Sequence, residues 1–168
     1  MALRLLLTEE CLFLNTYHYM TIATLDLHIL HLVRRWSEPM ARFGLFICFA
    51  WFGILKVIGL SPATGLVHAL FDQTIPFLNF DYFYIAFALF EVVIGVLFLI
   101  KGCERVVFPL LLLHMFTTFL PLIFVPGISW SAPFVPTLEG QYIIKNVVLI
   151  AAAMGIVAHL HPLQQIKK

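Results

Sequence analysis

The sequence predicts an all-α integral membrane protein, a four-helix bundle preceded by an amphipathic helix at the membrane interface. Hydrophobic residues make up 62% of the 168 residues, charged residues make up only 11%, and the mean hydropathy is +1.00. Four apolar segments are each long enough to cross a bilayer as a helix of about 20 residues. Within the bilayer a segment must satisfy its own backbone polar groups, and this requirement favours helices.

The N-terminal segment, residues 1–39, is predicted to contain the interfacial helix. Over residues 17–36 the polar side chains recur at three- and four-residue intervals, which places them on one face of a helix. These residues are Thr21, Thr24, His28, His31 and Arg35. The sequence Ser37-Glu38-Pro39 is expected to end this helix, with Pro39 entering the first turn of the next one.

The bundle is predicted over residues 40–162, followed by a cytoplasmic tail at 163–168. Its spans lie at about 40–60, 82–101, 106–124 and 141–161. Proline and glycine mark the ends of the first three spans. The connecting segments 61–81 and 125–142 are expected to lie outside the membrane core, with Trp130, Phe134 and Tyr142 suited to the headgroup layer.

The basic residues predict the orientation of the four spans. Arg42, Lys101 and Arg105 fall on one side, together with the basic residues of both ends of the chain, and the two loops on the other side contain no Lys or Arg. The positive-inside rule then places both termini in the cytoplasm. We expect a multi-pass protein of a bacterial inner (cytoplasmic) membrane. The net charge of +1 and the lack of a long basic run give no indication of nucleic-acid binding.

Glu91 is the most unusual residue of the second span, because an ionised carboxylate in the middle of a bilayer is costly unless it finds a partner or carries a proton. With a rise of about 1.5 Å per residue, Glu91 and His114 both lie near mid-membrane. Lys56 and Lys145 lie somewhat further out, and Glu139 lies just beyond Lys145. These five residues could line a charged cavity that binds a ligand or handles protons: Lys56, Glu91, His114, Glu139 and Lys145.

Each residue of this predicted cavity also has a purely structural interpretation. Lys56 and Lys145 could extend their side chains to the headgroups. Glu91 could form an ion pair that only fixes the packing of the helices, and His114 could bond a backbone carbonyl, Thr117 or Thr118. A second group of histidines, His28, His31, His159 and His161, could meet at the cytoplasmic face and hold a metal ion, although their spacing matches no specific metal motif.

Two segments resemble a known family. The first span carries GLFICFAWFGILKVIGLSPATGLV, with Lys56 late in the span before a Ser-Pro exit, and the second carries EVVIGVLFLIKGCERV. Both are similar to the DoxX-like membrane proteins. The segment PTLEGQYIIKNVVLIAAAM most resembles the branch that contains the reactive-chlorine resistance membrane protein. The resemblance covers roughly residues 40 to 158 and implies a four-helix bundle linked to redox or oxidative-stress physiology. It assigns importance to Lys56, Glu91, Gly95, Glu139 and Lys145.

The leading hypothesis is a small inner-membrane protein of redox or stress physiology whose charged cavity binds a quinone or a small polar ligand, beside a partner subunit. The alternative is a non-enzymatic structural or assembly subunit of a larger membrane complex. A third interpretation is a minimal transporter or channel, which would require the chain to form a homo-oligomer because four spans are few. The sequence leaves open whether the chain is an enzyme.

Overall fold

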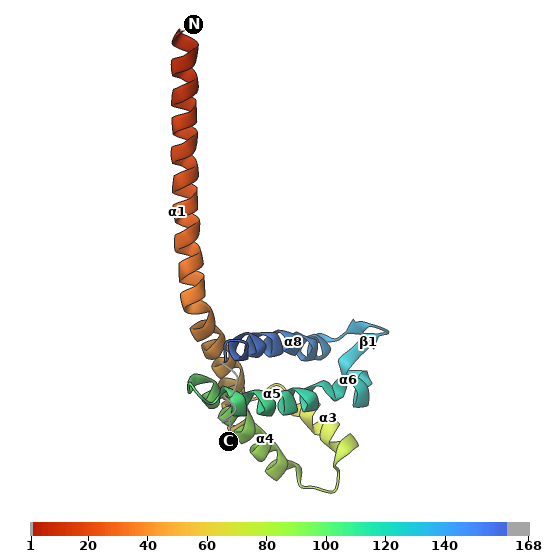
Figure 1. Cartoon of the computed structure of the whole chain (residues 1–168). Helices are drawn as coiled ribbons and strands as arrows, with labels where there is room; N and C mark the ends of the chain where they lie inside the picture. Colours follow the sequence, from red (N-terminus) through yellow and green to blue (C-terminus); the bar gives the residue numbers. More distant parts are fainter. Residues whose placement is uncertain (1, 161–168) are drawn as a thin grey trace, which may run out of the picture. The chain divides into compact units, whose positions relative to one another are not determined.

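The structure, a computed structural model, describes the backbone of residues 2–160 and the side chains of residues 23–160. Its elements are almost all helices, joined by short turns and one small β-hairpin (Figure 1). The chain divides between Pro39 and Met40 into two units, which are described separately. The predicted all-α fold is therefore confirmed.

The first unit belongs to a single long helix, α1 (Ala2–Phe46), which includes Pro39. The prediction that Ser37-Glu38-Pro39 ends a helix is wrong. The fixed φ of proline is compatible with a helix, and the missing N–H removes only one backbone hydrogen bond. The hydroxyl of Ser37 donates to the carbonyl oxygen of Arg34 at 3.4 Å, one turn before the proline. The interfacial position predicted for residues 17–36 stays a prediction.

The second unit begins with the end of α1 and continues through a π-helical turn, η1 (Ile47–Trp51), into α2 (Phe52–Val57). These elements pack against α4 (Phe80–Leu99). Two glycines allow close contact between them. A Cβ added at Gly53 would lie 2.8 Å from the carbonyl oxygen of Ala88, and one added at Gly95 would lie 2.6 Å from the backbone nitrogen of Ala50.

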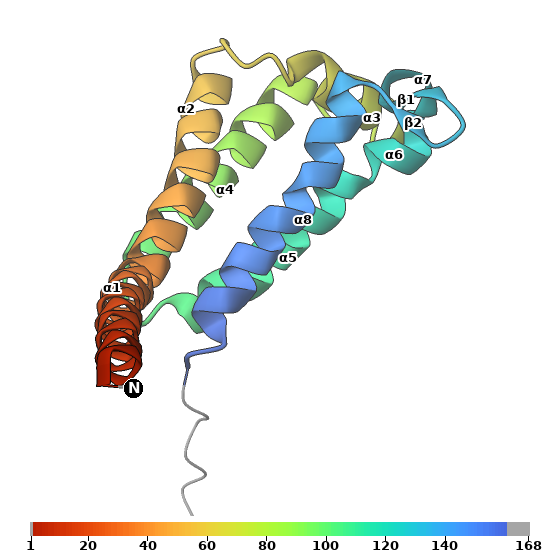
Figure 2. The same cartoon turned by 90° about the horizontal axis from the view of Figure 1, so that it is seen from above.

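The bundle is completed by α5 (Glu104–Phe119), the short α6 (Pro121–Phe124) and α8 (Leu138–Val157). Figure 2 shows α2, α4, α5 and α8 running side by side. All four of the long helical segments contribute to one buried apolar cluster, because each turns an apolar stripe inward. Its members are Leu45, Phe49, Ile94, Phe98, Val107, Leu111, Met115, Ala153 and Ile156.

Four helices of the described chain are long and apolar enough to cross a membrane. They cover Ala23–Val57, Phe80–Leu99, Glu104–Phe124 and Leu138–Val157. Each contains most of one predicted span. The first is longer than predicted because α1 continues through Pro39.

The segment between the first two spans contains a helix that the sequence did not predict, α3 (Thr64–Thr74). Phe71, which is only 4% exposed, fixes it to α4 through ring contacts with Phe80 and Phe83, at 5.4 and 5.1 Å between centroids. A hydrogen bond of 2.7 Å joins the hydroxyls of Thr64 and Tyr84. We call this end of the bundle the α3 end, and the opposite end, at the α4–α5 connection, the turn end.

The connection between α6 and α8 is a compact structure rather than an open loop. It consists of α7 (Pro126–Ser129) and an antiparallel hairpin of β1 (Trp130–Ala132) and β2 (Val135–Pro136). The buried Ser129 donates its hydroxyl to the carbonyl oxygen of Pro121 at 2.9 Å. Thr137 caps α8 by accepting from the backbone N–H of Gly140 at 3.1 Å.

Candidate functional site

Lys56 and Glu91 form an ion pair inside the bundle, between α2 and α4. The ammonium of Lys56 donates to Oε2 of Glu91, and the two residues are only 7% and 6% exposed. Gly53 lies one turn before Lys56 and brings α2 against the backbone of α4. This close approach places the lysine at the depth of Glu91, so that its side chain reaches the carboxylate instead of extending to the headgroups.

His114 brings α5 into the same cluster. Its Nε2 lies 3.0 Å from Oε1 of Glu91, and its Nδ1 lies 3.3 Å from the hydroxyl of Thr118. A carboxylate accepts hydrogen bonds only, so Nε2 carries the proton that is donated to Glu91. The imidazole is enclosed by the rings of Phe49, Phe87 and Phe90, at 5.4, 5.1 and 6.1 Å between centroids.

The charges of this cluster balance one another. Lys56 and Glu91 contribute one positive and one negative charge, and a neutral His114 adds none. A second cation beside Lys56 would be a buried charge with no counterion of its own, which is strongly unfavourable in an apolar interior. Both oxygens of Glu91 are occupied, one by Lys56 and the other by His114. The arrangement can therefore hold a proton between imidazole and carboxylate without exposing either group to lipid.

A cavity of about 140 Å³ adjoins the cluster at the α3 end. Lys56 and Glu91 line it on one side, and Thr117 and Thr118 of α5 add two hydroxyls. Apolar side chains of α3 also line the cavity, with further contributions from α4, α6 and α8. They include Leu66, Val67, Leu70 and Phe71. The lining of the cavity thus combines a few polar side chains with many apolar ones.

The structure brings together three of the five predicted site residues, namely Lys56, Glu91 and His114. Lys145 is exposed, and its ammonium lies 5.3 Å from the centre of the Tyr142 ring, where it makes a cation–π contact. Glu139 is exposed in the first turn of α8. Neither forms a hydrogen bond or ion pair with the cluster among residues 23–160. Depth along the span grouped Lys145 with Lys56, but the rotation of α8 turns its side chain outward.

The histidines proposed for a metal site do not form one within the described chain. His28 donates through Nδ1 to the carbonyl oxygen of Thr24 at 2.9 Å, and His159 donates through Nδ1 to the carbonyl oxygen of Gly155 at 2.8 Å. His31 is exposed, and His161 lies outside the described residues. Over residues 23–160 no group of three or more His, Cys, Asp or Glu side chains is arranged to hold a metal ion.

A second buried ion pair, which the sequence interpretation missed, lies at the turn end. Arg42 donates through Nη2 to Oε1 of Glu104 and through Nη1 to the carbonyl oxygen of Phe98 at 3.1 Å. The other oxygen of Glu104 accepts from the N–H of Gly102 at 2.8 Å, where a positive φ of 97° suits glycine. The signal was an acidic residue opening α5 directly after a glycine turn.

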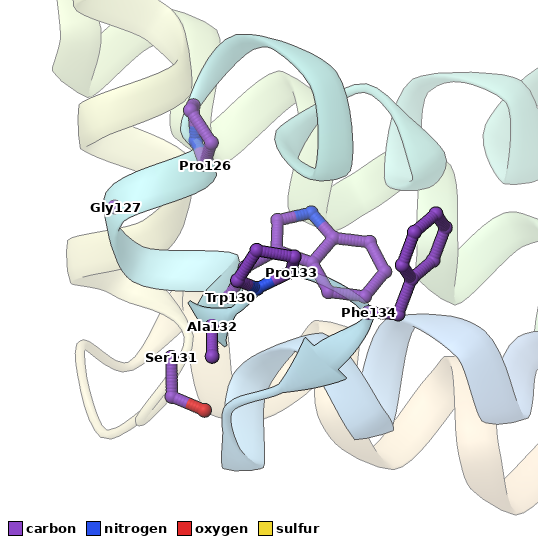
Figure 3. A pocket seen from close by; sticks show the side chains of 7 residues that line it. All are labelled: Pro126, Gly127, Trp130, Ser131, Ala132, Pro133 and Phe134. Atoms are coloured by element: carbon purple, nitrogen blue, oxygen red, sulfur yellow. The ribbon is translucent and has the colours of Figure 1, made fainter.

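A second, larger hollow lies away from both ion pairs, on α7 and the β-hairpin (Figure 3). Its volume is about 530 Å³, and it opens widely to the surroundings. None of its lining residues is charged or titratable: Pro126, Gly127, Trp130, Ser131, Ala132, Pro133 and Phe134. The indole nitrogen of Trp130 already donates to the carbonyl oxygen of Leu122 at 2.9 Å. The polar cluster with its smaller cavity is therefore the better candidate site.

The fold and this site define the class of the protein: a multi-pass membrane protein with four candidate spans and a charged cluster inside its helical bundle. Comparison with protein-family models, with curated proteins and with solved structures gives no match.

Proposed function

We propose that this chain is a DoxX-like membrane protein of redox or oxidative-stress physiology, and that the cavity beside Lys56 and Glu91 binds a quinone headgroup or another small polar ligand. The observation that supports this most is the position of the cavity. It adjoins an ion pair that is buried at mid-bundle, where charges are costly to keep without a role.

The size of the cavity is consistent with a ligand of one ring. Typical sites for drug-sized ligands have volumes of about 300–1,000 Å³, whereas an apolar cavity of about 150 Å³ in another protein accommodates benzene. A volume of about 140 Å³ therefore fits a single six-membered ring. A longer isoprenoid tail would have to leave through the apolar side.

The three polar residues of the cluster would have different roles in this function. Lys56 would donate a hydrogen bond to a ligand oxygen, while Glu91 and His114 would accept and pass on a proton across their 3.0 Å contact. Lys145 and Glu139, which lie on the exposed surface of α8, have no part in this mechanism.

The proposal includes a bacterial inner membrane with both termini in the cytoplasm. Arg42, Lys101 and Arg105 all lie at the turn end of the second unit, and no Lys or Arg occurs in the segments 61–81 and 125–139 at the other end. By the positive-inside rule the turn end faces the cytoplasm. The cavity would then lie in the outer half of the membrane, where a redox partner subunit could exchange electrons or ligand with it.

The test measures, by calorimetry, the affinity of a short-chain quinone analogue for the full chain in nanodiscs. Glu91→Gln keeps the shape and an acceptor oxygen but removes the charge, and we expect it to weaken binding and abolish physiological activity while the protein stays folded. Lys145→Gln is the matched control, because it removes a lysine at similar depth that lies outside the cluster. Unchanged activity in Glu91→Gln would contradict the mechanism.

A structural or assembly role is the second candidate, and one observation favours it. Both oxygens of Glu91 already have partners within the bundle, so this carboxylate needs no ligand to be satisfied. In that case the purified protein would bind no quinone or small polar ligand, and Glu91→Gln would change only its thermal stability. Co-purification with one fixed partner would support this role.

A further inference from the structure

The hydrogen-bonding groups of the cavity limit the chemistry of its ligand. The ammonium of Lys56 has three N–H donors. One is donated to Glu91, and the ammonium lies 5.6 Å from the centre of the Phe87 ring, which occupies a second direction. No other acceptor for it is found among residues 23–160. One donor of Lys56 therefore remains for a ligand in the cavity that this lysine lines.

The two threonines that line the cavity present hydrogen-bond acceptors, in contrast to the donor of Lys56. The hydroxyl of Thr117 donates to the carbonyl oxygen of His114 at 2.7 Å, and that of Thr118 has its shortest contact with the same oxygen at 2.9 Å. A hydroxyl has one proton and two lone pairs. The Nδ1 of His114, 3.3 Å from the Thr118 hydroxyl, is a further acceptor for the Thr118 proton. Because both threonine protons are directed to acceptors on His114, the threonine oxygens can act toward the cavity only as acceptors.

The balance of charge favours a neutral ligand. Lys56 and Glu91 cancel each other, so an anion in the cavity would have no unpaired positive charge to meet. It would also lose its hydration on entering a cavity with a largely apolar lining. An aromatic ring, in contrast, suits the apolar side chains that α3 contributes to the lining, among them Phe71.

We propose that the cavity selects a neutral aromatic ring that carries a hydroxyl group, a phenol or hydroquinone, over the corresponding quinone and over an anion. The hydroxyl oxygen accepts from Lys56, and a hydroxyl proton is donated to the oxygen of Thr117 or Thr118. A quinone carbonyl can satisfy the lysine but has no proton for the threonines. This inference rests on the proposed function, since it requires that the cavity binds a ligand.

The inference is tested by measuring phenol, anisole and benzoate binding to the full chain in nanodiscs, with empty nanodiscs subtracted. Phenol donates and accepts, anisole only accepts, and benzoate is an anion of similar ring size. We expect phenol to bind about tenfold more tightly than anisole, the ratio that one additional hydrogen bond provides, and benzoate to bind more weakly than both.

Substitution of the threonines isolates their contribution. The double variant Thr117→Val and Thr118→Val keeps the branched shape and removes both acceptors, so it should bring the phenol-to-anisole ratio close to one. Lys145→Gln should leave that ratio unchanged. Equal affinity of phenol and anisole for the unmodified protein, or tighter binding of benzoate, would overturn the selectivity while leaving the proposed function intact. A protein that binds none of the three probes would overturn both.

Discussion

The ammonium of Lys56 donates to Oε2 of Glu91 across 35 sequence positions, and His114 occupies the other oxygen of the same carboxylate. The three residues come from three different helices of the bundle. They form a closed, neutral cluster beside a cavity, and the first prediction concerns the energy of its ion pair.

Removing one member of the ion pair should destabilise the bundle far more than removing both. Glu91→Leu leaves the buried ammonium of Lys56 without its counterion, and we expect the free energy of unfolding to fall by about 3–5 kcal/mol. The double variant Lys56→Met and Glu91→Leu should recover most of this loss, because replacing a buried pair with apolar side chains is often neutral. Denaturant titration in detergent measures the free energy of unfolding of the single and the double variant, with Lys145→Met as the control. A Glu91→Leu variant as stable as the original chain would show that the pair is not fixed in the interior.

The Arg42–Glu104 pair should stabilise the turn end. Arg42→Met leaves the carboxylate of Glu104, which is only 4% exposed, without its guanidinium and should cost about 3–5 kcal/mol. Lys101→Met removes an exposed charge from the same end, so its effect should stay within about 0.5 kcal/mol. Thermal unfolding of both variants in one detergent compares them directly. Equal melting temperatures would argue against a buried pair at this end.

Gly95 should be intolerant of a side chain. In Gly95→Ala the new Cβ would lie 2.6 Å from the backbone nitrogen of Ala50 and 2.9 Å from its Cβ, so α4 must move away from η1. Overpacking of this kind typically costs about 1–3 kcal/mol. Gly155→Ala is the matched control within α8, because its Cβ meets nothing within 4 Å, and it should be neutral or stabilising by about 0.5–1 kcal/mol. The two melting temperatures should therefore shift in opposite directions or by clearly different amounts.

Phe71 should hold α3 over the cavity. Phe71→Ala removes the ring contacts with Phe80 and Phe83, and we expect α3 to open locally while the apolar cluster of the bundle stays folded. Hydrogen exchange of residues 64–74 should become faster, whereas exchange in α4 and α5 should change little. The exposed Phe77 provides the control, since Phe77→Ala removes a ring that is 80% exposed. Unchanged exchange in α3 would show that other contacts hold it.

The sequence predicted the class of fold and the approximate spans because length and hydropathy alone decide whether a helix can cross a bilayer. It could not show that α1 continues through Pro39, since a proline inside a helix and one at its start have the same local signature. It also missed α3, whose eleven residues are stabilised by packing on α4 more than by any sequence signal.

For the candidate site, too, the sequence determined one part and the tertiary structure another. Counting residues along each span determined that Lys56, Glu91 and His114 lie at similar depths, because the rise of a helix is constant. Depth says nothing about rotation, and so it grouped Lys145 and Glu139 with them. Only the tertiary structure decided which side chains face one another: the close contacts at Gly53 and Gly95 fix how α2 and α4 are turned, and the packing of α8 turns Lys145 away.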